Sequence, residues 1–216
     1  MHPTVIFDLD GTLTKRDTYI QFLAFCLKEV GLRTFSVVFL PFYALLHMCF
    51  IINNERLKEI FLKKMLSGMT LDELIPIIEK YINKLFIKGL NKPVVEKLNE
   101  HLMEGHKVIL ATASFNLYTL KLAEKFGIKH VVCTMAEVVD GVLTGRIIGR
   151  NCHGQEKVRR IEEILSQSEL SSSMFYTDHH SDLPLLRKVK QGILVNPSLR
   201  TRCLTAKLNL PVLRLR

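Results

Sequence analysis

The chain has 216 residues, of which 48% are hydrophobic and 24% are charged, so it is too apolar to be intrinsically disordered. Its 11 glycines and 7 prolines are too few for a collagen-like or low-complexity protein. The formal net charge of +9 indicates an anionic partner. The mean hydropathy of +0.17 is high for such a basic chain. This combination disfavours nucleic acid as the partner, because surfaces that bind nucleic acids are polar as well as basic.

Positive charge and apolar residues are concentrated in two separate segments. After Asp182 the chain has no acidic residue but carries eight lysines and arginines. Residues 35–52 carry no formal charge. A helix of that length would span about 27 Å, close to the thickness of a bilayer core, so this segment alone is a candidate membrane span. Both segments also fit peripheral contact with an anionic membrane.

The N-terminal residues and the cysteines indicate a cytoplasmic protein. The sequence MHPTVIFDLDG lacks the basic region of a signal peptide, and acidic residues interrupt its apolar run. The 5 cysteines are scattered and form no CxxC pair. This pattern predicts free thiols rather than a disulfide framework or a zinc site.

The order of the predicted elements favours a parallel α/β sheet. A short strand, Thr4–Phe7, comes first, and helices without any strand pattern follow at 17–30, 33–52, 55–66 and 71–86. Further strands are predicted at 107–112, 130–134, 174–177 and 191–195, with a hairpin at 137–149 that turns at Asp140-Gly141. Further helices are predicted at 93–104, 116–126 and 155–167, after Asp182 and at the C-terminus, with a loop at 166–173. Strands separated by helices form parallel βαβ units. We therefore predict a core of residues 1–14 and 89–216 and an all-helical cap of residues 15–88.

Polar side chains follow three of these predicted strands. Asp8 and Asp10 follow the first strand, Thr112 ends the second, and Asp178 and Asp182 follow a later one. In open α/β sheets, ligands bind beyond the carboxyl ends of the strands. Four carboxylates gathered there would repel one another, and a hard cation such as Mg²⁺ relieves this repulsion. The sequence therefore predicts a magnesium site at this edge.

The same residues suit phosphoryl transfer. Asp8 would attack phosphorus and form an aspartyl phosphate, while Asp10 would protonate the leaving oxygen and then activate water. Thr112 and Lys157 would hold the phosphate oxygens, and Mg²⁺ would offset their charge. Gly11 would let the backbone approach the phosphate closely.

Four segments resemble, in order, the four motifs of the haloacid dehalogenase (HAD) superfamily. They are DLDGTLT at 8–14, LATAS at 110–114, GQEK at 154–157 and TDHHSD at 177–182. The helical insertion, the DGVLTGRIIG hairpin, the CHGQEK segment and a late VNP resemble subclass IB hydrolases, namely phosphoserine phosphatases and type C phosphatidylglycerophosphatases. The resemblance implies a Rossmann-like parallel sheet with a helical cap after the first strand. It also implies a Mg²⁺-dependent phosphomonoesterase that forms an aspartyl phosphate.

The resemblance assigns a role to each candidate site residue. Asp8 is implied to be the nucleophile and Asp10 the acid and base. The residues implied to contact the phosphate are Gly11, Thr112, Ala113 and Lys157. The residues implied to hold Mg²⁺ are Asp8, Asp178 and, through its backbone carbonyl, Asp10, with Asp182 supporting the metal shell.

Two positions depart from phosphoserine phosphatases and leave the substrate open. Asp17 stands where those enzymes place a glutamate that reads the amino group, although it also suits the N-cap of the next helix. Lys63 and Lys64 precede Gly68, but no arginine stands in register there. The apolar cap and the basic C-terminal segment favour a phosphorylated lipid or head-group precursor. The alternative is a small metabolite such as phosphoserine or histidinol phosphate.

Three further alternatives are weighed against the motifs. A single membrane span at 35–52 would separate Asp8 from Asp178, and Pro41 interrupts it. We therefore expect its Phe and Leu residues to lie in the core or against neighbouring cap helices, with a re-entrant or surface-lying segment as the remaining possibilities. A phospho-accepting signalling module is disfavoured by the large insertion and by Asp10. Ligation of a metal by His179 and His180 is disfavoured because Mg²⁺ does not favour imidazole.

Overall fold

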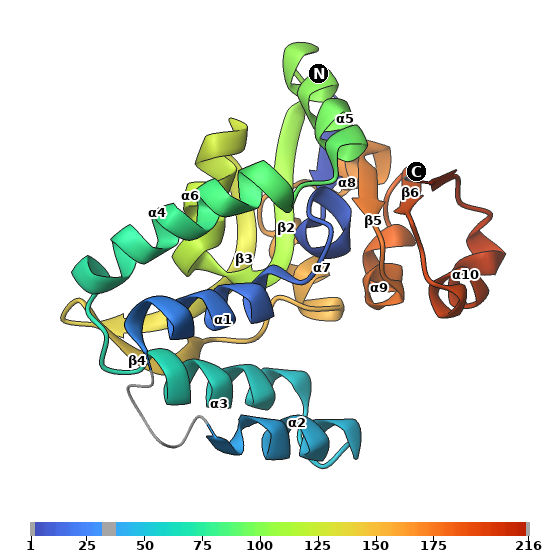
Figure 1. Ribbon diagram of the computed structural model, residues 1–216. Coiled ribbons are helices and arrows are strands. Elements are labelled where there is room, and N and C mark those ends of the chain that lie inside the picture. The colour runs from blue at the N-terminus through green and yellow to red at the C-terminus, as the bar shows by residue number, and fades with distance from the viewer. Residues whose placement is uncertain (1–2, 32–37, 215–216) are drawn as a thin grey trace.

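A seven-stranded sheet with the order β4-β3-β2-β1-β5-β6-β7 organises the molecule. The computed structural model describes residues 3–31 and 38–214 (Figure 1). All neighbouring strands are parallel except β3 and β4, which form an antiparallel pair. The strands are β1 (Thr4–Phe7), β2 (Lys107–Phe115), β3 (His130–Val139), β4 (Val142–Ile148), β5 (Met174–Thr177), β6 (Gln191–Val195) and β7 (Val212–Leu213). The predicted α/β fold is confirmed, as is the turn at Asp140-Gly141.

Side chains of the central strands alternate between two apolar cores, one on each face of the sheet. Val5 and Phe7 of β1 belong to one core, whereas Ile6 belongs to the other, as the period of two in a strand requires. The first core is covered by α1 (Thr18–Val30), α4 (Leu71–Lys88), α5 (Lys92–Met103) and α6 (Asn116–Phe126). The second is covered by α7 (Gln155–Glu162), α8 (Gln167–Ser172) and α9 (Leu183–Leu186). The sheet is thus buried on both sides, which parallel sheets require.

The described residues between β1 and α5 include the helices α1, α2, α3 and α4. Of these, α2 spans Leu40–Met48 and α3 spans Asn54–Leu66. Side-chain caps fix where α1 and α3 begin: Asp17 accepts from the Ile20 amide and Asn53 from the Arg56 amide. Figure 1 shows α2 alongside α3, on the side of the molecule away from the sheet. The division into core and cap domains stays a prediction.

The apolar segment differs from expectation. The predicted helix at 33–52 is shortened to α2, where Pro41 occupies the first turn instead of kinking the helix. Residues 33–37 of the prediction lie outside the described residues. No residue of α2 is buried, so its Phe and Leu side chains do not lie in the core. The helix does pack against α3, which was the other half of the expectation. The exposed side chains are Val38, Phe39, Phe42, Leu45, Met48, Phe50 and Ile51. Among the described residues, no helix combines the length and the apolar composition needed to span a membrane.

Three other predicted segments are corrected. Residues 166–173, predicted as a loop, contain α8, because Ser166 and Glu169 form a capping box that starts a helix in this serine-rich stretch. The strand at 130–134 continues without a break into the hairpin, so that β3 reaches Val139. The C-terminal helix α10 (Leu199–Thr205) forms, but the chain then continues into β7, an edge strand beside β6.

Candidate functional site

A cavity of about 380 Å³ lies where β1 and β5 end, and most of the predicted site residues line it. The predicted residues among its lining are Asp8, Asp10, Gly11, Ala113, Lys157, Asp178 and Asp182. Thr112 is the exception. Its side chain is fully buried, and its Oγ1 accepts a hydrogen bond from the Ser114 amide and lies 3.5 Å from Asp10 Oδ2. The sheet therefore brings together side chains that are up to 174 positions apart in the sequence.

The turn after β1 aims the first two aspartates. The Asp8 amide donates to the Tyr176 carbonyl of β5 at 2.9 Å, which extends the β1–β5 pairing up to the site. The chain then makes one wide turn over Leu9–Leu13. Gly11 in this turn has a positive φ of 74°, and a Cβ atom there would overlap the carboxylate of Asp178. Glycine is thus required at this position by both backbone conformation and close approach.

Lys157 joins two of the carboxylates. Its Nζ lies 2.9 Å from Asp8 Oδ1 and 2.7 Å from Asp182 Oδ1, and all three side chains are almost completely buried. The Thr177 hydroxyl donates to the other oxygen of Asp182 at 2.7 Å. Burial opposes the charge of Lys157, but Asp182 and Asp8 outweigh this effect and raise its pKa. The amine is therefore held as a cation between two carboxylates.

Lys157 neutralises only part of the negative charge of the four aspartates Asp8, Asp10, Asp178 and Asp182. Burial raises the pKa of Asp8 well above its usual value, Lys157 opposes this, and Asp182, Asp178 and Asp10 add to it. Burial, followed by the charge of Asp182, raises the pKa of Asp178 to about 7. A hard divalent cation among these oxygen atoms would relieve both effects. The chemistry of the donor set therefore fits Mg²⁺.

Asp10 is held by the start of α1 and by the end of β2. Its Oδ1 accepts from the Thr18 amide of α1 at 2.5 Å, and its Oδ2 accepts from the Ser114 hydroxyl at 2.7 Å. The Thr18 hydroxyl in turn lies 3.0 Å from the Tyr118 hydroxyl, so that Asp10 belongs to a buried hydrogen-bond network. This network fixes the Asp10 carboxylate at the cavity wall.

Several residues that line the cavity were not predicted from the sequence, and two of them contact other site residues or the backbone around the cavity. Lys58 of α3 reaches the cavity, where its Nζ donates to the Ala113 carbonyl at 2.7 Å and to Asn151 Oδ1 at 3.1 Å. Burial lowers its pKa. Ser114 lies within the LATAS segment, two positions after Thr112, and lines the cavity. The LATAS pattern thus offered a signal for Ser114, whereas no pattern separates Lys58 from the other lysines of its helix.

Asp17 serves as a helix cap and also lines the cavity. Its Oδ1 accepts from the Ile20 amide at 2.8 Å, which confirms the N-cap interpretation. Burial and then the charge of Asp10 raise its pKa. Lys58 of α3 and Asp17 at the start of α1 thus bring one basic and one acidic group to the same cavity.

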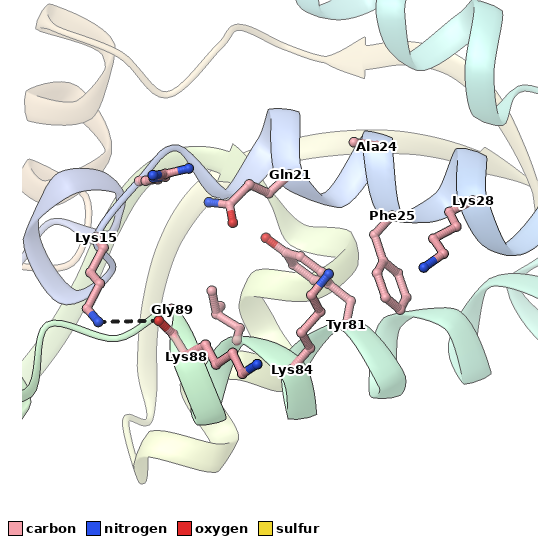
Figure 2. A pocket seen from close by; sticks show the side chains of 11 residues that line it. Lys15, Gln21, Ala24, Phe25, Lys28, Tyr81, Lys84, Lys88 and Gly89 are labelled. Atoms are coloured by element: carbon pink, nitrogen blue, oxygen red, sulfur yellow. Dashed lines mark hydrogen bonds between the residues drawn. The ribbon is translucent and has the colours of Figure 1, made fainter.

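A second cavity, of about 420 Å³, lies between α1 and α4 (Figure 2). Its lining includes Lys15, Arg16, Lys28, Lys84 and Lys88, and no acidic residue is among the described residues around it. Lys15 and Arg16 line both cavities, which are therefore neighbours. A strongly basic region thus adjoins the carboxylate cluster.

Comparison with known proteins places the chain in a family. The model of the haloacid dehalogenase-like hydrolases matches residues 5–187. A Bordetella pertussis protein of unknown function has a solved structure that is 27% identical and superposes over the full length of both chains with a TM-score of 0.87.

Two comparisons involve phosphoserine phosphatases. The Mycobacterium tuberculosis phosphoserine phosphatase SerB1 is 28% identical over 141 residues, which are 64% of this chain but 46% of that protein. The chain thus spans less than half the length of this relative. A solved phosphoserine phosphatase, described as a phospho-aspartyl intermediate analogue, is 18% identical to this chain. The superposition covers all of this chain and 94% of that one, with a TM-score of 0.66, which shows a shared fold. Because the family model covers most of the sequence, this chain belongs to the haloacid dehalogenase-like hydrolase family.

Proposed function

We propose that this protein is a Mg²⁺-dependent phosphomonoesterase that forms an aspartyl phosphate on Asp8. The observation that carries the proposal is the pairing of Asp8 with Lys157 at 2.9 Å beside Asp10 and Asp178 in one cavity. Relatives named as phosphatases support it. The proposal also places the protein in the cytoplasm, as its free cysteines suggest.

The reaction would proceed in two steps. In the first, a carboxylate oxygen of Asp8 bonds to phosphorus while the ester P–O bond breaks, and protonated Asp10 gives its proton to the leaving oxygen. In the second, Asp10 takes a proton from water, and the resulting hydroxide bonds to phosphorus. The acyl phosphate bond to Asp8 then breaks, which releases inorganic phosphate and restores both carboxyl groups.

The surrounding residues would hold the phosphoryl group. Lys157 and the backbone near Gly11 and Ala113 would contact its oxygens, and Ser114 would keep Asp10 in place. Asp8, Asp178 and the Asp10 carbonyl would hold Mg²⁺, supported by Asp182. The ion would neutralise charge between Asp8 and the phosphate.

The character of the cavity favours a small polar substrate. Its lining is mostly charged or polar, and the exposed apolar side chains of α2 are absent from it. Lys58, ten positions before Gly68, offers a basic group in the cavity, and Asp17 offers an acidic one. Together they suit a leaving group with a carboxylate and an ammonium, as in phosphoserine. Histidinol phosphate has an ammonium but no carboxylate, so Asp17 would bind its ammonium and Lys58 would have no anionic partner on it. A phosphorylated lipid is the second candidate, and only the exposed face of α2 favours it.

A direct test is phosphate release by the purified chain with Mg²⁺ from phosphoserine, histidinol phosphate, lysophosphatidate, phosphatidylglycerophosphate and an aryl phosphate. We expect turnover that Asp8→Asn and EDTA both abolish. Phosphoserine should be the best substrate, and Lys58→Met should raise its KM more than that of histidinol phosphate. Failure of every ester to exceed the Asp8→Asn background would refute the proposal. A long-lived phosphoprotein without turnover would instead indicate a signalling module.

We also propose peripheral contact with anionic membranes through α2. Seven large apolar side chains between Val38 and Ile51 are exposed, a grouping that soluble surfaces rarely carry without a partner. Lys64 of α3 lies over the Tyr43 ring at 5.3 Å, which brings positive charge beside this face. Figure 1 shows α10 in a different part of the molecule from α2, so the proposal depends on α2 and not on the basic C-terminal segment.

A further inference from the structure

Three potential metal ligands meet where α5 ends and the chain turns into β2. The Nδ1 atoms of His101 and His106 are 2.9 Å apart, and Glu104 Oε2 lies 3.9 Å from the first and 3.5 Å from the second. The point equidistant from these three atoms lies about 2 Å from each of them. This is the bond length of zinc to imidazole nitrogen and to carboxylate oxygen.

The backbone brings these side chains together. His101 and Glu104 are three residues apart at the end of a helix, which places them on the same face. Gly105 then adopts a positive φ of 73°, and the His106 amide donates to the His101 carbonyl at 3.0 Å. This tight reversal returns His106 to the side of His101.

A neighbouring tyrosine orients His101 as a ligand. His101 Nε2 lies 3.2 Å from the Tyr176 hydroxyl, and its ring packs against Phe7 and Tyr176. When Nε2 donates to the tyrosine oxygen, Nδ1 is unprotonated, and its lone pair can accept from His106 Nδ1 or bind a metal ion. Such a second hydrogen bond is typical of metal-binding histidines. Burial and then His106 lower the pKa of His101, which favours the neutral ring that ligation needs.

We propose that His101, Glu104 and His106 form a binding site for Zn²⁺ or a similar first-row divalent ion, separate from the carboxylate cluster. Three protein ligands leave a fourth position to water. The two imidazoles select against Mg²⁺, which prefers oxygen ligands. Their side chains are 12% and 14% exposed, so they are ordered by packing, whereas Glu104 is exposed and reaches the ion from solvent. A bound ion would tie the α5–β2 turn to β5 through Tyr176.

The test is Zn²⁺ titration by calorimetry in the Asp8→Asn/Asp178→Asn background with excess Mg²⁺, which suppresses binding at the carboxylate cluster. We expect one Zn²⁺ per chain and a rise in Tm with Zn²⁺ concentration. Glu104→Ala and His106→Ala should each weaken binding about 100-fold, and Tyr176→Phe about 10-fold. His130→Ala, an exposed histidine elsewhere, should bind as the background does.

Two outcomes would overturn the proposal. One is stoichiometric binding that Glu104→Ala and His106→Ala leave unchanged, which would place Zn²⁺ elsewhere. The other is no binding, which would mean that the 2.9 Å contact is a metal-free hydrogen bond between the two imidazoles. Circular dichroism without Zn²⁺ checks that each variant folds. Glu104 is exposed, so its replacement keeps the test decisive even if a histidine variant unfolds.

Discussion

At the scale of single residues, the site depends on one lysine shared by two buried carboxylates. Replacing Lys157 with methionine would leave Asp8 and Asp182 without their cation. Breaking a buried pair in this way costs about 3–5 kcal/mol of unfolding free energy, and activity should be lost as well. Urea denaturation measures the change. Lys188→Met, which breaks an exposed pair with Glu162, is the control and should cost at most about 1 kcal/mol. Equal stability of the two variants would contradict the shared role of Lys157.

The protonation of Asp178 predicts how stability changes with pH in the absence of metal. Its pKa rises from 3.8 when unfolded to about 7 in the fold, so the folded state binds the proton more tightly. The stability that this proton contributes is complete below about pH 4 and is lost as the pH rises through 7. Denaturation in EDTA at pH 5 and pH 7.5 should show this loss, and Asp178→Asn should reduce it. A loss of the same size in the variant would assign the dependence to Asp8 or another group.

The sequence located the residues with strong chemical patterns but not those placed by the cap. Asp8, Asp10 and Asp178 follow strands, and parallel strands end at one edge, so their meeting was predictable. Thr112 and Ser114 are two positions apart and share a face of β2, and both hydroxyls approach Asp10 Oδ2, at 3.5 Å and 2.7 Å, but only Ser114 also lines the cavity. Lys58 reaches the site only because α3 packs across the end of the sheet, a tertiary relation that no local pattern encodes.

At the scale of elements, α2 shows why an apolar run need not be core. Residues 38–52 are apolar throughout, so the sequence has no polar face from which to infer its orientation. Among the described residues, this helix packs against α3, and none of its own side chains is buried. In contrast, α4 alternates apolar and charged faces, and its buried residues follow the helical period. Its burial was therefore predictable, whereas that of α2 was not.

The exposed face of α2 predicts membrane binding that depends on its apolar side chains. Phe42→Ser/Phe50→Ser should reduce flotation with vesicles that contain anionic lipid, because both side chains are exposed and would enter the lipid interface. Activity on a soluble aryl phosphate should not change, since neither residue lines the cavity. Leu120→Ser, an exposed leucine of α6, is the matched control and should float as the wild type does. Absence of wild-type flotation with every vesicle composition would refute the membrane contact.

At the scale of the whole molecule, part of the excess positive charge lies around the cavity between α1 and α4. The net charge of +9 alone allowed several kinds of anionic partner. Five basic residues now surround a cavity beside the carboxylate cluster, with Lys15 and Arg16 common to both. The positive potential there would offset the negative charge of the aspartates along the approach to the site. An anionic phosphate ester would otherwise be repelled by that cluster.

This arrangement predicts a kcat/KM that falls as the salt concentration rises. Raising the ionic strength from about 0.01 M to 0.15 M shortens the screening length from about 30 Å to 8 Å, so kcat/KM should fall while kcat stays nearly constant. Lys28→Glu/Lys84→Glu should lower kcat/KM about 10-fold at low salt and flatten its salt dependence, because both residues line the basic cavity without belonging to the carboxylate cluster. The control is Lys207→Glu, in the short helix Ala206–Leu208 that follows α10. Each substitution changes the net charge by the same amount, but Lys207 does not line either cavity, so kcat/KM should change little. If Lys207→Glu lowered kcat/KM as much per charge as the cavity variant, net charge and not the position of the cavity would govern substrate capture.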